Sequence, residues 1–266
     1  MSTDDIDAAV DWLGAPVDCG ACAHHDRLAA GKCKPLRACV FDRYARRIDR
    51  FFDWNPDLAR DYVAHDYFEV RACAAKAAEI FLLPAMLDDP EEAVRWSAAR
   101  RLPRRYILRL RSDPHREVRI RIAGRLEGAD LLPMMSDVDY AVRQAVAKKL
   151  PPDMLVLMIN DADPAVRRVV ASRIAQAALM RLAGDADPVV RLEAAKRLEP
   201  VDLRALRKDP DWRIRYEVAQ RAEAEAIGPL VNDDDPLVRE CATQRRTAAG
   251  LDLPSNVIVA QKRSDP

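Results

Sequence analysis

A strict 24-residue period dominates this sequence and constrains its fold more than any other feature. Arginine recurs at eight positions without one slip in the spacing, Val or Ile precedes each arginine, and Ala stands four residues after seven of them. Leu or Ile follows twelve residues after each arginine. This agreement defines eight units that tile residues 65–256, and it predicts a stack of similar structural units. The repeated arginines are Arg71, Arg95, Arg119, Arg143, Arg167, Arg191, Arg215 and Arg239.

Each unit has the pattern of one longer helix followed by a short helical turn. Asp163-Pro164 and the equivalent pairs are typical helix starts, because Asp caps backbone N–H groups and Pro loses nothing at the first helical position. Apolar or small residues one before and three, four and seven after the arginine form one helical face. Later apolar positions, three residues apart, suit a 3₁₀ or single α turn. We therefore expect an all-α solenoid, with the repeated alanines at the close contact between successive helices.

Better-known repeats fit this period less well. A leucine-rich repeat has a similar length, but its L-x-x-L-x-L-x-x-N strand signature is absent. HEAT and armadillo units share the D-P-x-V-R-x-x-A-A helix pattern but need about 40 residues each. The sequence therefore predicts a shorter, different helical solenoid.

Four of the six cysteines lie close together in the segment VDCGACAHHDRLAAGKCKPLRACVF, residues 17–41. They are Cys19, Cys22, Cys33 and Cys39, with the spacing C-x₂-C-x₁₀-C-x₅-C. Four thiolates can hold a tetrahedral zinc ion or an iron–sulfur cubane, and the spacing alone leaves both alternatives open. Free structural thiols do not explain such a density.

Composition narrows the class of protein. Acidic and basic residues balance at 43 each, so no net charge draws the chain towards nucleic acid or a membrane. The acidic N-terminus lacks the layout of a signal peptide, and no run approaches the about 18 apolar residues of a membrane span. We therefore expect a reducing cytoplasm, no membrane, and metal or redox chemistry at the cysteines. No catalytic motif is present, so we do not expect an enzyme.

The repeats and the cysteine cluster together resemble the leucine-rich repeat variant family, iron–sulfur repeat proteins of nitrogen-fixing bacteria. The resemblance rests on the D-x-D-P-x-V-R-x-x-A-A-x-R-L units and the four clustered cysteines, and it covers most of the chain. It implies alternating α and 3₁₀ helices in a right-handed superhelix. It also implies that Cys19, Cys22, Cys33 and Cys39 hold a [4Fe–4S] cluster, with zinc as the alternative.

The resulting domain prediction has three parts. Residues 1–64 form the cysteine-cluster domain and a capping helix, residues 65–256 form eight repeats, and residues 257–266 form a tail. The capping helix is predicted from FDRYARRIDRFFDW (41–54), in which aromatic and aliphatic side chains recur on one helical face. Such a helix would cover the apolar end of the first repeat.

Other residues near the cysteines have alternative interpretations. His24 or His25 could replace a cysteine as a ligand, although four thiols are already present. Cys73 and Cys241 each follow a repeated arginine by two residues and are expected on the outer face, with Cys73 a weak candidate for a fifth ligand. Basic residues among the cysteines could lower the thiol pKa values or could be solvated surface charges. They are Arg27, Lys32, Lys34 and Arg37.

Two charged positions recur along the repeats. The repeated arginine lies inside the apolar helical face and needs an acceptor, and the regular Asp six residues before it is the expected partner, within a unit or between neighbours. A second cation stands six residues after the arginine. It could follow a phosphate backbone, or it could belong to a solvated face that favours helix C-termini. These cations are Arg101, Arg125, Lys149, Arg173, Arg197, Arg221 and Arg245.

Three functions are compatible with these patterns. The one we adopt is a scaffold whose repeats bind an unknown protein partner, while the cluster domain caps the array or reports redox state, because repeat surfaces generally serve recognition. The second is electron transfer through the cluster. The third is nucleic-acid binding along the second row of cations, a weaker alternative because basic and acidic residues nearly balance after residue 64.

Overall fold

The structure is a computed structural model that describes residues 8–251. The predicted tail at 257–266 and the end of the last predicted repeat lie outside the described residues. Regular structure within 8–251 is helical, and two isolated backbone bridges, Val10 with Pro16 and Lys34 with Ala38, have β geometry. The chain divides into two compact units, Met1–Leu126 and Glu127–Pro266, each considered by itself. The domain boundary placed after residue 64 stays a prediction.

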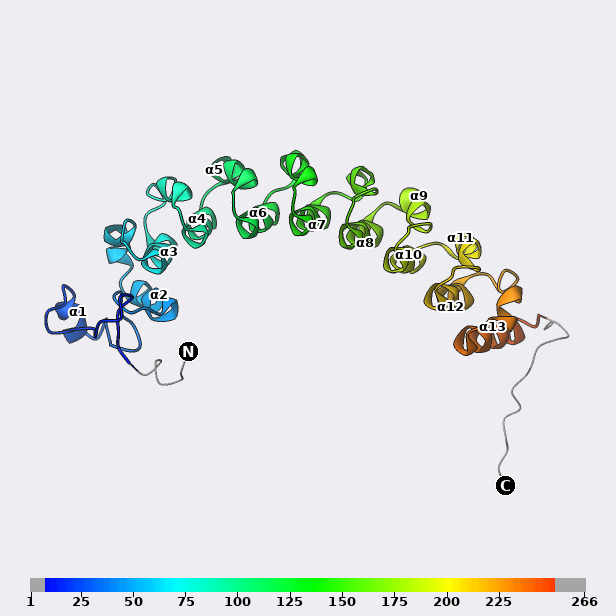
Figure 1. The fold of residues 1–266 in the computed structure, drawn as a ribbon, viewed down its shortest axis with the longest axis horizontal. Helices are drawn as coiled ribbons and strands as arrows, with labels where there is room; N and C mark the ends of the chain where they lie inside the picture. The colour runs from blue at the N-terminus through cyan, green and yellow to red at the C-terminus, as the bar shows by residue number, and fades with distance from the viewer. Residues whose placement is uncertain (1–7, 252–266) are drawn as a thin grey trace, which may run out of the picture. The chain divides into compact units, whose positions relative to one another are not determined.

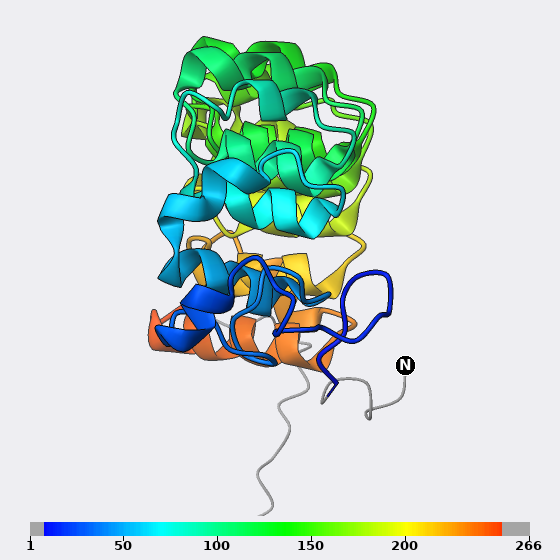
Figure 2. The same ribbon diagram turned by 90° about the vertical axis from the view of Figure 1, so that its left-hand side faces the viewer.

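The first unit starts with a loop-rich segment, dark blue in Figure 2, and continues into repeats. From α2 onward, longer α-helices are separated by short 3₁₀ helices, with the single α turn α5 before η4 (Figure 1). In chain order they are α1 (His25–Ala29), α2 (Ala45–Trp54), η2 (Pro56–Tyr62), α3 (Phe68–Ala77), η3 (Ala85–Asp88), α4 (Glu92–Ala99), α5 (Arg104–Ile107), η4 (Leu108–Ser112) and α6 (Arg116–Ala123).

The second unit consists of the same alternation. In some repeats a single α turn precedes the 3₁₀ helix, so the expected 3₁₀ or α turn is confirmed in both forms. The elements are η5 (Gly128–Ser136), α7 (Tyr140–Lys149), η6 (Met154–Met158), α8 (Pro164–Arg173), α9 (Gln176–Leu179), η7 (Met180–Leu182), α10 (Pro188–Ala195), α11 (Pro200–Leu203), η8 (Arg204–Leu206), α12 (Trp212–Arg221), η9 (Gly228–Asn232) and α13 (Pro236–Ala248).

The long helices start where the sequence predicts. Asp163 caps α8 by accepting a hydrogen bond from the N–H of Ala165, and Pro164 occupies the first helical position. The same cap recurs at α10 and α13, with Asp187 and Asp235. In the first unit, helices α3, α4 and α6 begin without a side-chain cap. Their first turns therefore depend more on packing against neighbouring helices.

Two layers of helices enclose the core of each unit. Within a unit the longer α-helices lie side by side and the short helices form the other layer (Figure 1). The repeated alanines are fully buried where the α-helices meet, for example Ala171 and Ala195, which confirms the predicted close contact. Between the layers lie the side chains twelve and fifteen residues after the arginine, such as Leu179 and Leu182, both nearly inaccessible to solvent. A larger side chain in place of such an alanine would overpack the stack.

At six positions the repeated arginine links one repeat to the next. Arg167 donates from Nε and Nη2 to the two carboxylate oxygens of Asp185, at 2.7 and 2.8 Å, and from Nη1 to the backbone carbonyl of Asp161 at 2.8 Å. These hydrogen bonds lower the pKa of Asp185. The predicted partnership is thus confirmed, and it runs between neighbouring repeats. Equivalent pairs are Arg71–Asp89, Arg95–Asp113, Arg143–Asp161, Arg191–Asp209 and Arg215–Asp233.

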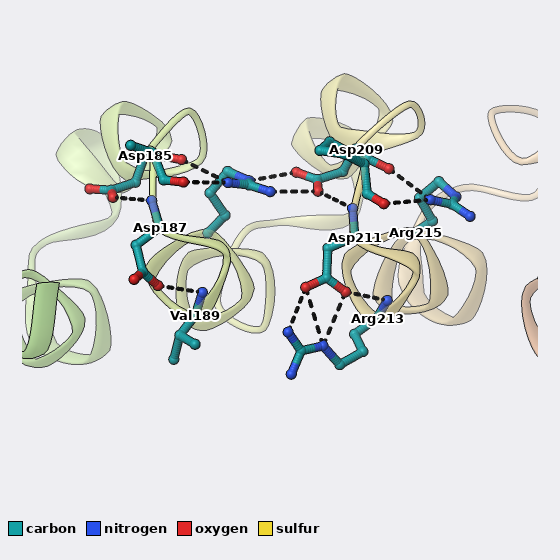
Figure 3. Close-up of polar contacts among 10 residues, drawn as sticks. Asp185, Asp187, Val189, Asp209, Asp211, Arg213 and Arg215 are labelled. Atoms are coloured by element: carbon teal, nitrogen blue, oxygen red, sulfur yellow. Dashed lines mark hydrogen bonds and ion pairs between the residues drawn. The ribbon is translucent and has the colours of Figure 1, made fainter.

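The aspartate has a second role in the turn before the next helix. Oδ1 of Asp185 accepts the N–H of Asp187 at 2.9 Å, and Oδ1 of Asp209 accepts the N–H of Asp211 at 2.8 Å (Figure 3). One carboxylate thus satisfies the guanidinium and a backbone donor together. In the first repeat His65 replaces the aspartate, and its Nδ1 accepts the N–H of Tyr67 at 3.0 Å. Eighteen residues before His65, at the position equivalent to the repeated arginine, Arg47 pairs instead with Asp42 at 3.0 Å.

Candidate metal centre

The last two clustered cysteines are brought together by a tight hairpin. Lys34 and Ala38 exchange two backbone hydrogen bonds of 2.8 Å, so the residues that flank the pair, Cys33 and Cys39, lie side by side. Both are buried, and their thiols lie close enough to shift each other's pKa. The five-residue spacing is therefore the length of one hairpin turn.

That hairpin contains a strained residue. Pro35 follows Lys34, the N–H of Arg37 donates to the carbonyl of Lys34 at 3.2 Å, and Leu36 has a φ of 61°. A positive φ at the third residue of such a turn normally selects Gly, and a leucine there is disfavoured by about 1–2 kcal/mol. Strained backbone of this kind is concentrated at functional sites.

The first two cysteines lie on a separate turn before α1. The side chain of Asp18 shapes this turn by accepting the N–H groups of Gly20 and Ala21, at 2.8 and 3.2 Å. Cys19 and Cys22 follow and are half-buried. The N–H of His24 donates to Sγ of Cys22 at 3.3 Å. Backbone donors to sulfur of this type tune the potential of thiolate-bound clusters.

The four thiols affect one another electrostatically. Burial and the charges of Cys39, Cys22 and Asp18 raise the pKa of Cys19. The hydrogen bond from Cys39 lowers the pKa of Cys33, and the same bond raises the pKa of Cys39. All six cysteines of the chain are free thiols. A cationic centre would hold such thiolates deprotonated and offset their repulsion, so this donor set fits a metal or cluster.

Between residues 8 and 251, no three His, Cys, Asp or Glu side chains meet closely enough to hold one metal ion. The predicted ligands Cys19, Cys22, Cys33 and Cys39 therefore remain a prediction, supported by their common location.

Both histidines that follow Cys22 have other contacts. His24 packs against the rings of Phe41, Phe51 and Tyr62, with centroid distances of 5.3–6.0 Å, and its Nε2 lies 2.5 Å from the Tyr62 hydroxyl. Burial lowers the pKa of His24 and raises that of Tyr62 to about 12. Nδ1 of His25 lies 3.1 Å from the carbonyl oxygen of Cys19. These contacts fix the turn that carries the first two cysteines.

A buried asparagine attaches the cysteine loop to the helix that follows it. Asn55, fully buried at the end of α2, donates from Nδ2 to the carbonyls of Lys32 and Phe51 at 2.8 and 2.9 Å. Its Oδ1 accepts from Arg27 at 3.4 Å. Lys32 immediately precedes Cys33, so Asn55 holds the start of the hairpin in place. Asn55 was not predicted from the sequence, because a single Asn carries no recognisable pattern.

Helix α2 acts as the predicted cap. Its side chains Ile48, Phe51 and Phe52 are buried, and the helix packs beside α3 of the first repeat. The prediction that Cys73 lies on the outer face is wrong. Cys73 is 2% exposed, and its Sγ lies 3.6 Å from the carbonyl oxygen of Ala45. Burial raises the pKa of Cys73 to about 12. The outer position is buried in this repeat because α2 covers it.

The basic residues among the cysteines make contacts of their own. Arg27 pairs with Asp57 at 2.8 Å, and the guanidinium of Arg37 lies 5.9 Å from the ring centre of Trp54. The pKa of Cys19 is raised by burial and by the charges of other cysteines and Asp18, and none of these basic residues contributes to the shift. These two arginines therefore fasten the loop to the segment at residues 54–57.

The second row of cations stabilises the C-terminal ends of the α-helices. Arg197 donates to the carbonyls of Ala171 and Ile174, at 2.6 and 2.8 Å, where helix α8 of the preceding repeat ends. Such bonds satisfy the unpaired carbonyls of a helix C-terminus and favour its dipole. Equivalent bonds to the preceding repeat are made by Arg101, Arg125, Arg173, Arg221 and Arg245. These guanidinium groups are thus engaged in structural contacts.

Fold and site together define a helical repeat protein with an N-terminal four-cysteine domain. Residues 9–61 match the family model described as LRV protein FeS4 cluster. A solved structure described as a leucine-rich repeat variant with a novel repetitive protein structural motif is 39% identical, with a TM-score of 0.82, over 86% of this chain and 98% of that chain. The chain belongs to the leucine-rich repeat variant family, and residues 9–61 are its iron–sulfur domain.

A curated relative is similar over a shorter range. The uncharacterized 27.7 kDa protein in the nifB 3′ region of Rhodobacter capsulatus is 48% identical over 94 residues. That range is 35% of this chain and 38% of the relative, so the match spans little more than a third of either protein. None of the helices between residues 8 and 251 has the length and apolar character needed to span a membrane.

Proposed function

We propose that this protein is a cytoplasmic, non-catalytic scaffold whose repeats bind a protein partner and whose N-terminal domain holds a [4Fe–4S] cluster. Cys19, Cys22, Cys33 and Cys39 would be the ligands. The observation that supports this most is the gathering of four free thiols in the segment that matches the FeS4 family model. The nif-region location in the name of the Rhodobacter capsulatus relative supports a role connected with nitrogen fixation.

The chain supplies the ligands and controls their surroundings. The bound cluster would supply a one-electron redox centre that is sensitive to oxygen. Each thiol pair is held by its own turn, one shaped by Asp18 and the other by the Lys34–Ala38 bridge. The rings around His24 keep water from one side of the loop, and Asn55 ties that loop to α2. The state of the cysteine segment can therefore affect the cap of the first repeat.

Protein binding is favoured over nucleic-acid binding along the second row of cations. Six of those guanidinium groups already donate to carbonyls of the preceding repeat. A phosphate backbone would have to compete with these contacts. The exposed surfaces of stacked repeats are extended and suit recognition of another protein.

The test of the cluster is anaerobic purification with iron, sulfide and zinc counted per chain, followed by the spectrum on exposure to air. We expect about four irons and four sulfides and a visible absorption that bleaches in air. One zinc and no sulfide would make the domain a structural cap and would remove its redox role. Hydrogen exchange of protein with and without its cluster then shows whether the first repeat depends on the cluster.

A further inference from the structure

An unbalanced group of arginines lies in the first unit. Between Arg100 and Arg125 the chain has ten arginines, no lysine and two acidic residues, although the whole chain has no net charge. Four of these arginines occur within six positions, in the sequence RRLPRR, and all four are exposed. They are Arg100, Arg101, Arg104 and Arg105.

An apolar turn lies next to these arginines. Ile80 and Phe81 form the tip of the turn that links α3 to η3, and they are 51% and 70% exposed. They occupy the same positions in the first repeat as Arg104 and Arg105 in the second, 24 residues later. Equivalent positions of stacked repeats are neighbours.

Hydrogen bonds show that the second repeat contacts the chain on both sides of this turn. Arg101 donates to the carbonyls of Ala75, at 3.1 Å, and of Ala78, just before the turn. Arg109 donates to the carbonyl of Pro84, just after it, at 3.3 Å. The turn is thus held from both sides, so the two exposed apolar side chains are presented on a fixed backbone. We call Ile80, Phe81, Arg104 and Arg105 the Phe81 surface.

The composition of this surface favours an acidic protein segment over a nucleic acid as its anionic partner. Exposed aromatic and aliphatic anchors beside arginine, with lysine absent, are typical of the centre of a protein interface. Arginine also matches carboxylates in a bidentate geometry. Stacking of nucleobases is disfavoured, because Arg105 already lies 4.8 Å from the ring centre of Tyr106. A phosphate backbone would leave the apolar tip without a partner.

We propose that the Phe81 surface docks an acidic segment of a partner protein, with an apolar side chain of the partner against Phe81 and its carboxylates on Arg104 and Arg105. This inference rests on the proposed scaffold function and assigns the site and the chemistry of the partner. Charge complementarity guides the encounter, and the apolar contact fixes its register.

The test uses a defined peptide and the cluster-containing full-length protein. The probe is a fluorescent amphipathic peptide rich in Glu and Asp, with Leu and Trp spaced three and four residues apart, and its matched control has Gln and Asn in place of the acids. In fluorescence anisotropy we expect the acidic peptide alone to bind. The change Arg104→Glu with Arg105→Glu should weaken binding about tenfold, and Phe81→Ser about fivefold.

A charge-matched control is available in the second unit. Arg204 and Arg207 are exposed, so Arg204→Glu with Arg207→Glu changes the net charge equally and should leave binding within about twofold. An equal loss in this control, or no binding of the acidic peptide at millimolar concentration, overturns the proposal. Tighter, Arg104-dependent binding of a random DNA oligonucleotide or of phosphatidylglycerol vesicles also overturns it. Iron and sulfide counts on each variant show separately whether the cluster function holds.

Discussion

The repeats between residues 65 and 251 pair their buried charges within the chain, whereas the cysteine segment at residues 17–41 places four thiols near one another, and these would repel one another as thiolates. In the repeats, six of the arginines pair with a carboxylate one repeat later, as Arg167 does with Asp185, and that aspartate also closes a turn. In the cysteine segment, burial and then the charges of other cysteines and Asp18 raise the pKa of Cys19. One region thus distributes its stability over many similar contacts, and the other, under the proposed function, depends on a single bound centre.

This difference predicts how each region fails. Loss of one contact in the repeats leaves other pairs intact, since stability in stacked repeats is a sum of local and nearest-neighbour terms. Loss of the centre in the cysteine segment removes its main constraint at once, because metal binding and folding of a small domain are coupled. Mutations placed in the two regions test this contrast.

The largest effect is expected from Cys39→Ser. This change removes one predicted ligand from the buried hairpin, and we expect loss of nearly all bound iron and sulfide. Amide protection should then fall by more than about tenfold between residues 17 and 43, while helices α8 to α13 exchange as before. The measurement is hydrogen exchange with mass spectrometry, alongside iron and sulfide counts.

The control for this change is Cys241→Ser, on a half-buried thiol of the last described repeat. It should retain the cluster and the exchange pattern. Full iron content in Cys39→Ser would remove Cys39 from the ligand set. Loss of protection in the second unit would contradict the independence of the two regions.

Next in size is Asp185→Leu within the repeats. The change leaves the guanidinium of Arg167, which is 15% exposed, without its carboxylate, and it removes the acceptor for the N–H of Asp187. Removing one partner of a buried pair costs about 3–5 kcal/mol of unfolding free energy, measured here by urea titration. Iron content should not change.

A surface pair provides the comparison for this change. Glu193→Gln breaks the contact with Arg168, which is 60% exposed, and should change stability by about 0–1 kcal/mol. Similar losses in Asp185→Leu and Glu193→Gln would show that the repeated arginine pairs are no stronger than surface pairs.

The two regions also differed in how far sequence could predict them. A periodic pattern specifies local structure in every unit, so the helix caps, the buried alanines and the Arg–Asp partnership could all be inferred in advance. The pattern left open that the pair joins neighbouring repeats, because a one-dimensional spacing is compatible with contacts in either direction. It also left open whether the second row of cations, such as Arg197, was solvated or bound to helix ends.

Non-repeated contacts were beyond such an analysis. The Lys34–Ala38 bridge that aligns Cys33 with Cys39, and the Asn55 side chain that holds the loop, occur once and depend on tertiary packing. Cys73 was predicted on the wrong face because α2 covers its repeat. A helical wheel describes the faces of one helix and contains no information about the helices that pack on it. The arginine group at 100–125 was hidden by summing charge over the whole repeat region.

A smaller effect is expected from Asn55→Ala, which lies where the two regions meet. Two backbone carbonyls, those of Lys32 and Phe51, lose a buried donor, and this costs about 1–3 kcal/mol. The hairpin start should loosen, so a chelator should remove iron faster than from the unaltered protein. The measurement is the rate of iron loss to the chelator, followed by absorbance.

Asn160→Ala is the matched control, because Asn160 is exposed in the second unit. It should lose iron at the rate of the unaltered protein. An unchanged rate in Asn55→Ala, with stability lowered, would mean that Asn55 supports the cap without constraining the cysteines.

The smallest effect is expected from Arg197→Ala. Its guanidinium reaches the carbonyls of Ala171 and Ile174 at the end of α8, and the side chain is only half-buried, so water can replace it. We expect a loss of about 1 kcal/mol in urea unfolding. The exposed Lys196→Ala, one residue away, should change stability by less than about 0.5 kcal/mol. If Arg197→Ala instead matched Asp185→Leu, the second row would equal the buried pairs in strength. The array would then depend on helix ends as much as on its core.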